Sequence, residues 1–148
     1  MAVAAVGWVM TTGIESVHGA AAGAQGENAR LSVWDGAYTE EQATRGKNEY
    51  EYTCAGCHIH DLTGDSIADV PALAGPDFLA TWDGKTVKEL LDFMKMNMPP
   101  DSRGNLGADT YADIAAYVLQ ANKWPAGKEA LSDSSRLGRT FIERERKK

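Results

Sequence analysis

The chain concentrates its soft metal-binding side chains in one short segment, CAGCHIH, at residues 54–60. Both of its cysteines, Cys54 and Cys57, and two of its three histidines, His58 and His60, lie there. Thiolate sulfur and imidazole nitrogen are typical ligands of zinc, copper and iron. The segment therefore indicates a metal-binding, redox or covalent-attachment site, and the surrounding sequence has to decide between these chemistries.

Three chemistries fit the cysteine pair poorly. A structural zinc site needs four ligands, but His58 adjoins Cys57, and the only histidines beyond it are His60 and His18 near the N-terminus. A thioredoxin-like dithiol would begin a helix after a strand, whereas this segment ends a predicted helix. A disulfide would close a very small loop and stabilise little. The remaining interpretation is Cys-x-x-Cys-His, the attachment motif of a c-type haem.

The spacing has a physical reason. Two thiols one helical turn apart can add to the two vinyl groups on one side of a porphyrin, with His58 then beneath the iron as its first axial ligand. A second axial ligand is expected downstream, and FMKMNMPP supplies Met94, Met96 and Met98. Met94 is expected to fill a gap in the core. Met98 precedes Pro99, which biases it toward an extended conformation, so Met98 is favoured as the sixth ligand, with Met96 as its rival.

Helix signals predict the elements that position these residues. Capping boxes begin the first two helices, at Thr39–Gln42 and Thr86–Glu89. The third helix has apolar residues at i, i+3, i+4, i+7 and i+8 from Tyr111, and the second helix stops before two prolines. The predicted helices cover residues 39–54, 86–97 and 111–122. A long Gly-, Pro- and Asp-rich loop separates the first two, and no strand pattern is convincing.

Composition excludes two broad classes of function. The chain has 148 residues, 43% hydrophobic and 24% charged, as expected for one globular domain. Its net charge of −6 argues against a nucleic-acid binder. No apolar run is long enough to span a membrane. With so few helices and so much loop, the domain needs a disulfide, a metal or a cofactor to hold it together.

Several motifs together resemble a known family. CAGCH, PALAG, NMPP, NLGADTYADIAAYVL and PAG are similar to class I c-type cytochromes, in particular small single-haem periplasmic cytochromes and cytochrome modules of quinoprotein dehydrogenases. The resemblance covers about Asp35 to Gly127. It implies an all-α cytochrome c fold, in which three to five short helices and long loops wrap around one covalently bound haem.

The resemblance also implies roles for single residues. The first and last helices should cross near Gly46, with Tyr117 packed close, and the Pro71 carbonyl should accept a hydrogen bond from His58 Nδ1. Trp82 should either donate a hydrogen bond to a haem propionate or form a wall of the pocket. The cofactor-binding residues expected on this basis are Cys54, Cys57, His58, Met98, Pro71 and Trp82, with His58 and Met98 on the iron.

Two positions depart from the family pattern. Arg103 stands where relatives often have proline, which leaves the Met98 loop less rigid, and Gly107 stands where a Ser or Thr cap is common, so capping is expected to fall to Asp109. His60 is expected at the surface. The remaining aromatic residues considered are expected in the core: Tyr50, Phe78 and Phe93.

Composition along the chain suggests four regions. Residues 1–25 resemble a secretory signal peptide or its remnant, although no Lys or Arg precedes Arg30 to form a positive n-region. Residues 26–35 are interpreted as a linker and residues 36–127 as the cytochrome domain. Residues 128–148 form a charged C-terminal tail, rich in basic residues. A solvated tail is favoured over one docked on the acidic domain.

These observations favour a single-haem, one-electron carrier exported to the periplasm, not an enzyme, unless it is the electron-transfer subunit of an oxidoreductase. A thioether ligand raises the reduction potential, so we expect electrons from a dehydrogenase, such as a quinoprotein dehydrogenase, to pass toward a terminal oxidase. The alternative is a haem protein with a labile Met98 that acts as a peroxidase or gas sensor. A cofactor-free interaction module is the third class, and it requires that no haem be found.

Overall fold

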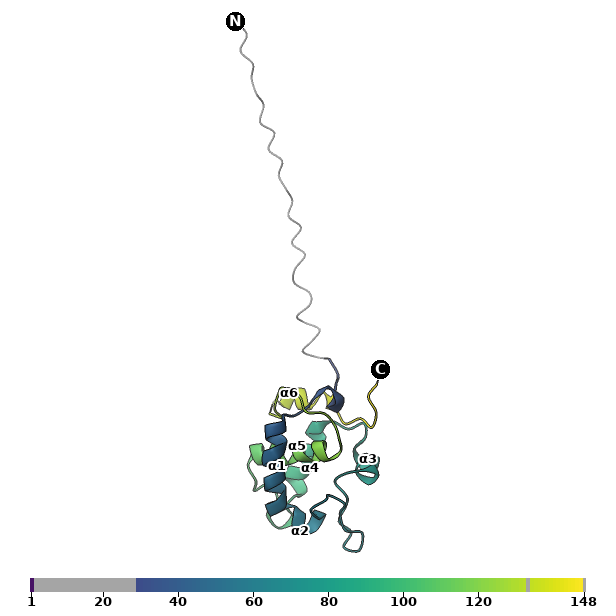
Figure 1. Cartoon of the computed structure of the whole chain (residues 1–148). Coiled ribbons are helices and arrows are strands. Elements are labelled where there is room, and N and C mark those ends of the chain that lie inside the picture. Colours follow the sequence, from purple (N-terminus) through teal and green to yellow (C-terminus); the bar gives the residue numbers. More distant parts are fainter. Residues whose placement is uncertain (2–28, 133, 148) are drawn as a thin grey trace.

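The structure is a computed structural model that describes Met1, residues 29–132 and residues 134–147. Apart from Met1, the expected signal peptide lies outside the described residues. The elements in chain order are β1 (Leu31–Ser32), the 3-10 helix η1 (Val33–Asp35), α1 (Glu40–Thr53), α2 (Ala55–His58), α3 (Pro76–Trp82), α4 (Val87–Asn97), the 3-10 helix η2 (Pro100–Ser102), α5 (Ala108–Ala121), α6 (Ser134–Leu137) and β2 (Thr140–Phe141). The three predicted helices correspond to α1, α4 and α5 (Figure 1). None of the helices in the described part is long and apolar enough to cross a bilayer.

The crossing of α1 and α5 is the main helix contact, and Gly46 makes it possible. A Cβ on Gly46 would lie 1.7 Å from the Asp113 carbonyl oxygen, so the two backbones touch where the side chain is missing. The expected crossing is therefore present, but its partner is the backbone at Asp113 instead of Tyr117. Tyr117 packs one turn further along α5, against Tyr50, with ring centroids 5.3 Å apart.

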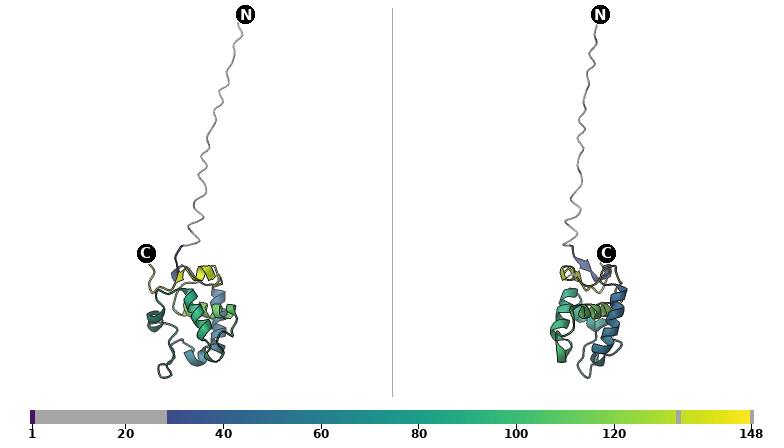
Figure 2. Two further views of the ribbon diagram at one scale, coloured as in Figure 1. Left: turned by 180° about the vertical axis from the view of Figure 1, so that it is seen from behind. Right: turned by 90° about the vertical axis from the view of Figure 1, so that its left-hand side faces the viewer.

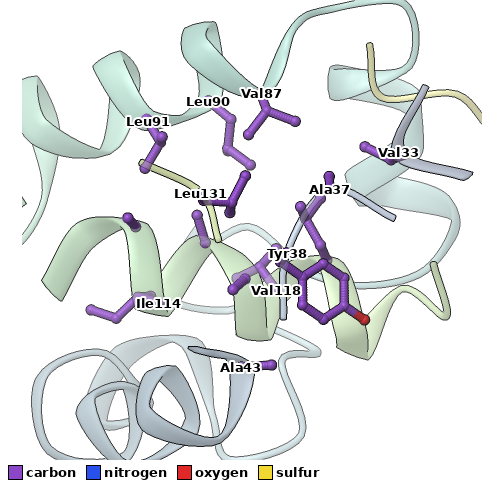
Figure 3. Packing of buried hydrophobic residues seen from close by; sticks show 14 of the residues in the cluster. Val33, Ala37, Tyr38, Ala43, Val87, Leu90, Leu91, Ile114, Val118 and Leu131 are labelled. Atoms are coloured by element: carbon purple, nitrogen blue, oxygen red, sulfur yellow. The ribbon is translucent and has the colours of Figure 1, made fainter. Parts of the chain in front are cut away.

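The core lies on both sides of α5. Figure 2 shows α5 between α1 and α4, and Figure 3 shows the buried side chains that fill the space. Leu90 and Leu91 project from α4 toward α5, and Ile114 lies on the side of α5 that faces α1. The i, i+3, i+4 spacing that predicted α5 corresponds to a helix buried on most of its sides.

The helix caps differ in part from expectation. Thr86 and Glu89 form the predicted capping box at the start of α4. Thr39 accepts a hydrogen bond from the Gln42 amide, but the Gln42 side chain does not return to it. The α5 N-cap is Gly107, with no side-chain hydrogen bond, so the expectation that Asp109 caps this helix is wrong.

The C-terminal tail packs on the domain, and the favoured prediction of a solvated tail is wrong. β2 pairs in parallel with β1, and the exposed fraction of Ile142 is 0%. Both polar groups of the Gln42 side-chain amide bond the Leu131 backbone, at 3.3 and 2.8 Å. The charge pattern of the tail gave no sign of this docking, because the tail has many charged side chains and only a few apolar ones. Those few apolar side chains are the ones that are buried. The part of the predicted linker in β1 and η1 lies beside the tail (Figure 1), since β1 pairs with β2.

Candidate functional site

The two cysteines lie on one helical turn. Cys54 is both the C-cap of α1 and the N-cap of α2. Its carbonyl oxygen accepts hydrogen bonds from the backbone amides of Cys57 (3.1 Å) and His58 (2.9 Å). Both cysteines are free; Cys54 is half-buried and Cys57 is exposed. Burial raises the pKa of the Cys54 thiol. The turn thus carries two free thiols three residues apart, followed at once by His58.

His58 is held by one ring nitrogen. Its side chain is buried, and its Nδ1 lies 2.9 Å from the Pro71 carbonyl oxygen, the contact expected from the family resemblance. A proline carbonyl can only accept, so Nδ1 must carry the proton and donate. In the neutral imidazole the other nitrogen, Nε2, then keeps its lone pair, which is the form that binds a metal.

The loop after His58 folds back on itself to deliver Pro71. Asp65 and Val70 exchange two backbone hydrogen bonds of 2.9 and 2.8 Å, and the Gly64 amide donates to the His58 carbonyl at 3.2 Å. The Leu73 amide then bonds the Leu62 carbonyl at 2.8 Å. These hydrogen bonds bring Pro71, 13 residues after His58, back against the His58 ring.

Asn122 fastens the far end of this loop. Its side-chain NH₂ donates to the Leu73 carbonyl at 2.9 Å, and its oxygen accepts from the Gly75 amide at 3.0 Å. Sequence reasoning used Asn122 only as a helix stop and missed this role. The available signal was a polar amide directly after an apolar helix, since a side chain with two donors and an acceptor there needs partners.

The three methionines occupy different environments. Met94 packs against the core, as expected, and Met96 is 66% exposed on α4. Met98 is half-buried at the end of α4, in the extended conformation that Pro99 favours, with φ −124° and ψ 147°. Its amide donates to the Met94 carbonyl at 2.8 Å, and its carbonyl accepts from the Tyr111 hydroxyl at 2.6 Å. Met98 is therefore the methionine that leaves the helix with its backbone held at both ends.

Aromatic side chains gather beside α4. Trp82 is buried, stacks on Phe78 at 6.2 Å and meets the edge of Phe93 at 5.5 Å. Tyr50 and Phe78 are in the core as expected, but Phe93 is 45% exposed, so its prediction as a core residue is wrong. Phe93 and Met96 are three residues apart on α4 and share a face that other protein atoms leave largely uncovered.

His60 is a surface residue, as predicted, and pairs with Glu51. In residues 29–132 and 134–147, no three His, Cys, Asp or Glu side chains are grouped as a metal site of their own would require.

Comparison with known proteins agrees with this geometry. A family model described as cytochrome c oxidase, cbb3-type, subunit III, matches residues 41–118, which is more than half of the chain. The chain belongs to this family of c-type cytochromes. The cytochrome therefore has the predicted all-α cytochrome c fold, and its general function is electron transfer with haem.

Other comparisons add little to the family match. The chain is similar to the sulfane dehydrogenase SoxCD from Paracoccus pantotrophus, with 24% identity, a TM-score of 0.45, and coverage of 62% of this chain and 53% of that one. The cytochrome thus spans about half the length of that chain. A search of curated proteins found no match.

The residues of the site fit haem c, the cofactor that the family implies. Cys54 and Cys57 present free thiols from one turn, and His58 keeps Nε2 available while Nδ1 is engaged. The exposed faces of Phe93 and Met96 provide apolar surface of the kind a porphyrin covers. An imidazole and a methionine thioether are the axial donors of cytochromes c, and two thiols are what covalent attachment of the porphyrin requires.

Proposed function

We propose that this cytochrome carries single electrons and holds one haem through thioether bonds from Cys54 and Cys57, with His58 and Met98 as its axial ligands. The observation that supports this most directly is the 2.9 Å contact between His58 Nδ1 and the Pro71 carbonyl. It orients a buried imidazole, beside two free thiols, with its metal-binding nitrogen unused. Haem iron, when bound, supplies the one-electron ferric and ferrous couple.

The protein's own residues favour a carrier over a catalyst. The two backbone hydrogen bonds of Met98 resist displacement of the residue, and a ligand that stays in place lets an electron arrive with little rearrangement. A catalyst or gas sensor needs that coordination position vacant. Met96 lies inside α4 and is 66% exposed, whereas Met98 leaves the helix in an extended conformation, which is why Met98 is preferred as the ligand.

The proposal extends to the pocket wall and to the partners. Among the described residues no group accepts a hydrogen bond from the Trp82 indole N–H, so this N–H suits a haem propionate; the Trp82 ring also forms a wall of the pocket.

A thioether ligand raises the reduction potential of the iron. The electron donor is therefore a dehydrogenase, of which a quinoprotein dehydrogenase is one candidate, and the electron acceptor is a terminal oxidase or a similar protein. The compartment we propose is the periplasm, where haem c attachment and export coincide.

A spectroscopic comparison of two methionine variants tests the proposal. Denaturation and acidic organic extraction should leave haem on the polypeptide, because thioether bonds do not depend on the fold. The oxidised protein should show the weak sulfur-to-iron charge-transfer band in the far red, and Met98→Ala should abolish it and admit carbon monoxide to the reduced iron. Met96→Ala is the matched control and should do neither.

Each other result points elsewhere. Haem that leaves with the solvent refutes covalent attachment. If Met96→Ala and Met98→Ala exchange effects, Met96 is the ligand. Rapid carbon monoxide binding and peroxide turnover by the unmutated protein would replace the carrier with the peroxidase or gas sensor.

A further inference from the structure

Tyr111, at the start of α5, has a hydroxyl that the packing of the fold does not require. The residue is 1% exposed, and a phenylalanine ring would fill the same space. A buried phenol must find a hydrogen-bond partner to offset its lost hydration. Here the partner is the Met98 carbonyl, at 2.6 Å. The hydroxyl of a core residue is thus directed to the backbone of the proposed iron ligand.

The segment after Met98 is poorly placed to hold the ligand by itself. Residues 100–105 are exposed, and their backbone makes short-range hydrogen bonds, from the Ser102 amide to the Pro99 carbonyl (3.0 Å) and from the Asn105 amide to the Ser102 carbonyl (3.1 Å). Arg103 stands there without the rigidity of a proline. The position of Met98 must therefore be set mainly from the helices on either side.

Two helices supply that support. The Met98 amide bonds the last turn of α4, and its carbonyl bonds the first turn of α5 through Tyr111. The separation of these helices is fixed by the packing of Leu90 and Leu91 against α5 (Figure 3). The Met98 backbone is consequently tied to the core at both of its polar groups.

We infer that Tyr111 is a positioning residue for Met98: its hydroxyl, by holding the Met98 carbonyl, stabilises the state in which the thioether is on the iron. This inference rests on the proposed function, since it assumes that Met98 is the ligand. Displacement of Met98 by another ligand moves its backbone and breaks the bond to Tyr111. The hydrogen bond thus favours the methionine-bound state over the displaced state.

Imidazole binding to the oxidised holoprotein tests the inference, with Tyr111→Phe as the variant and Tyr38→Phe as its matched control. The Tyr38 hydroxyl also donates to a backbone carbonyl, that of Trp124, at 2.7 Å, and Tyr38 is equally buried. We expect Tyr111→Phe to raise the affinity for imidazole about tenfold, the size of one buried neutral hydrogen bond. Tyr38→Phe should lower the melting temperature to a similar extent and leave imidazole affinity unchanged.

The outcomes separate the inference from the proposed function. If the unmutated protein shows no sulfur-to-iron band, or if Met98→Ala keeps the band, Met98 is not the ligand, and the proposed function fails with the inference. If the band is present and depends on Met98, and Tyr111→Phe binds imidazole no more tightly than Tyr38→Phe, the inference alone is overturned. If the band or the imidazole affinity changes in Tyr111→Phe and not in Tyr38→Phe, the inference is supported. A hydrogen bond with a purely structural role would give equal effects in the two variants.

Discussion

Gly64 is the residue on which the His58 geometry depends most closely. Its φ is +70°, and a Cβ there would lie 2.4 Å from the Val70 carbonyl oxygen and 2.6 Å from the Pro71 carbonyl carbon. The chain at Val70 and Pro71 therefore passes over Gly64 at backbone contact distance. This approach brings the Pro71 carbonyl within 2.9 Å of His58 Nδ1.

We expect Gly64→Ala to push the Pro71 carbonyl away from His58 and to destabilise the holoprotein by ~3 kcal/mol, from positive-φ strain together with the backbone overlap. Guanidinium unfolding would measure the loss. Gly84→Ala is the matched control, because Gly84 has φ +84° but open space at its Cβ position. Equal losses in both variants would show that the overlap with Pro71 costs nothing.

At the scale of elements, the crossing of α1 and α5 places the cysteine turn relative to the core. Gly46 sits against Asp113, and beside it Arg45 pairs with the Asp113 carboxylate through two hydrogen bonds of 2.7 and 2.9 Å. This pairing raises the pKa of the Arg45 guanidinium. Since α1 ends at Thr53, a shift of the helix at Gly46 would carry Cys54 and the attached turn with it.

Gly46→Ala should force α1 and α5 apart and cost ~3 kcal/mol or more, because its Cβ would overlap a backbone carbonyl that cannot rotate away. Gly56→Ala, in α2, is the control, since nothing lies within 4 Å of the added carbon. Circular dichroism, used to monitor unfolding of both variants, would compare their free energies of unfolding. A stability of Gly46→Ala equal to that of Gly56→Ala would contradict the close crossing.

At the scale of the whole molecule, the two ends of the described domain are fastened to each other. The indole N–H groups of Trp34 and Trp124 both donate to the Glu143 carbonyl, at 2.9 and 3.0 Å. The Glu143 carboxylate pairs with Arg30 at 3.0 Å and with Lys147 at 2.8 Å. These contacts hold the tail beside β1, at the end of the molecule where Figure 1 places both segments.

The pH dependence of stability tests this attachment. The Lys147 ammonium, followed by hydrogen bonds from Ser32 and Arg30, lowers the pKa of Glu143 from 4.5 to about 2. A lowered folded-state pKa means that the carboxylate stabilises the fold above pH 4.5 and that this contribution is lost as the pH falls toward 2. Glu143→Gln should therefore be less stable than the unmutated protein near pH 7, and the difference should shrink below pH 4.5. A difference that does not change with pH would contradict an ionised, paired Glu143.

Local chemistry made much of the fold and site predictable. The capping box at Thr86, the periodicity of α5 and the helix stop before Pro99 depend on neighbours in sequence, and all three are present. The extended conformation of Met98 was predictable for the same reason, because Pro99 restricts the residue before it. The assignment of Met98 and the cysteines to a haem remains a prediction.

Contacts between distant residues could be decided only by the tertiary structure. The amino-acid sequence by itself determined the three long helices, the Cys-x-x-Cys-His turn and the family resemblance, since each follows from residues within a few positions of one another, whereas the short helices α3 and α6 lie where it predicted a loop and a tail. It misjudged Phe93 and the tail, and it missed the bonds of Tyr111 to Met98 and of Asn122 to Leu73. Burial and the direction of a side-chain hydrogen bond depend on which segments of the folded chain meet, and a local pattern contains no information about that meeting.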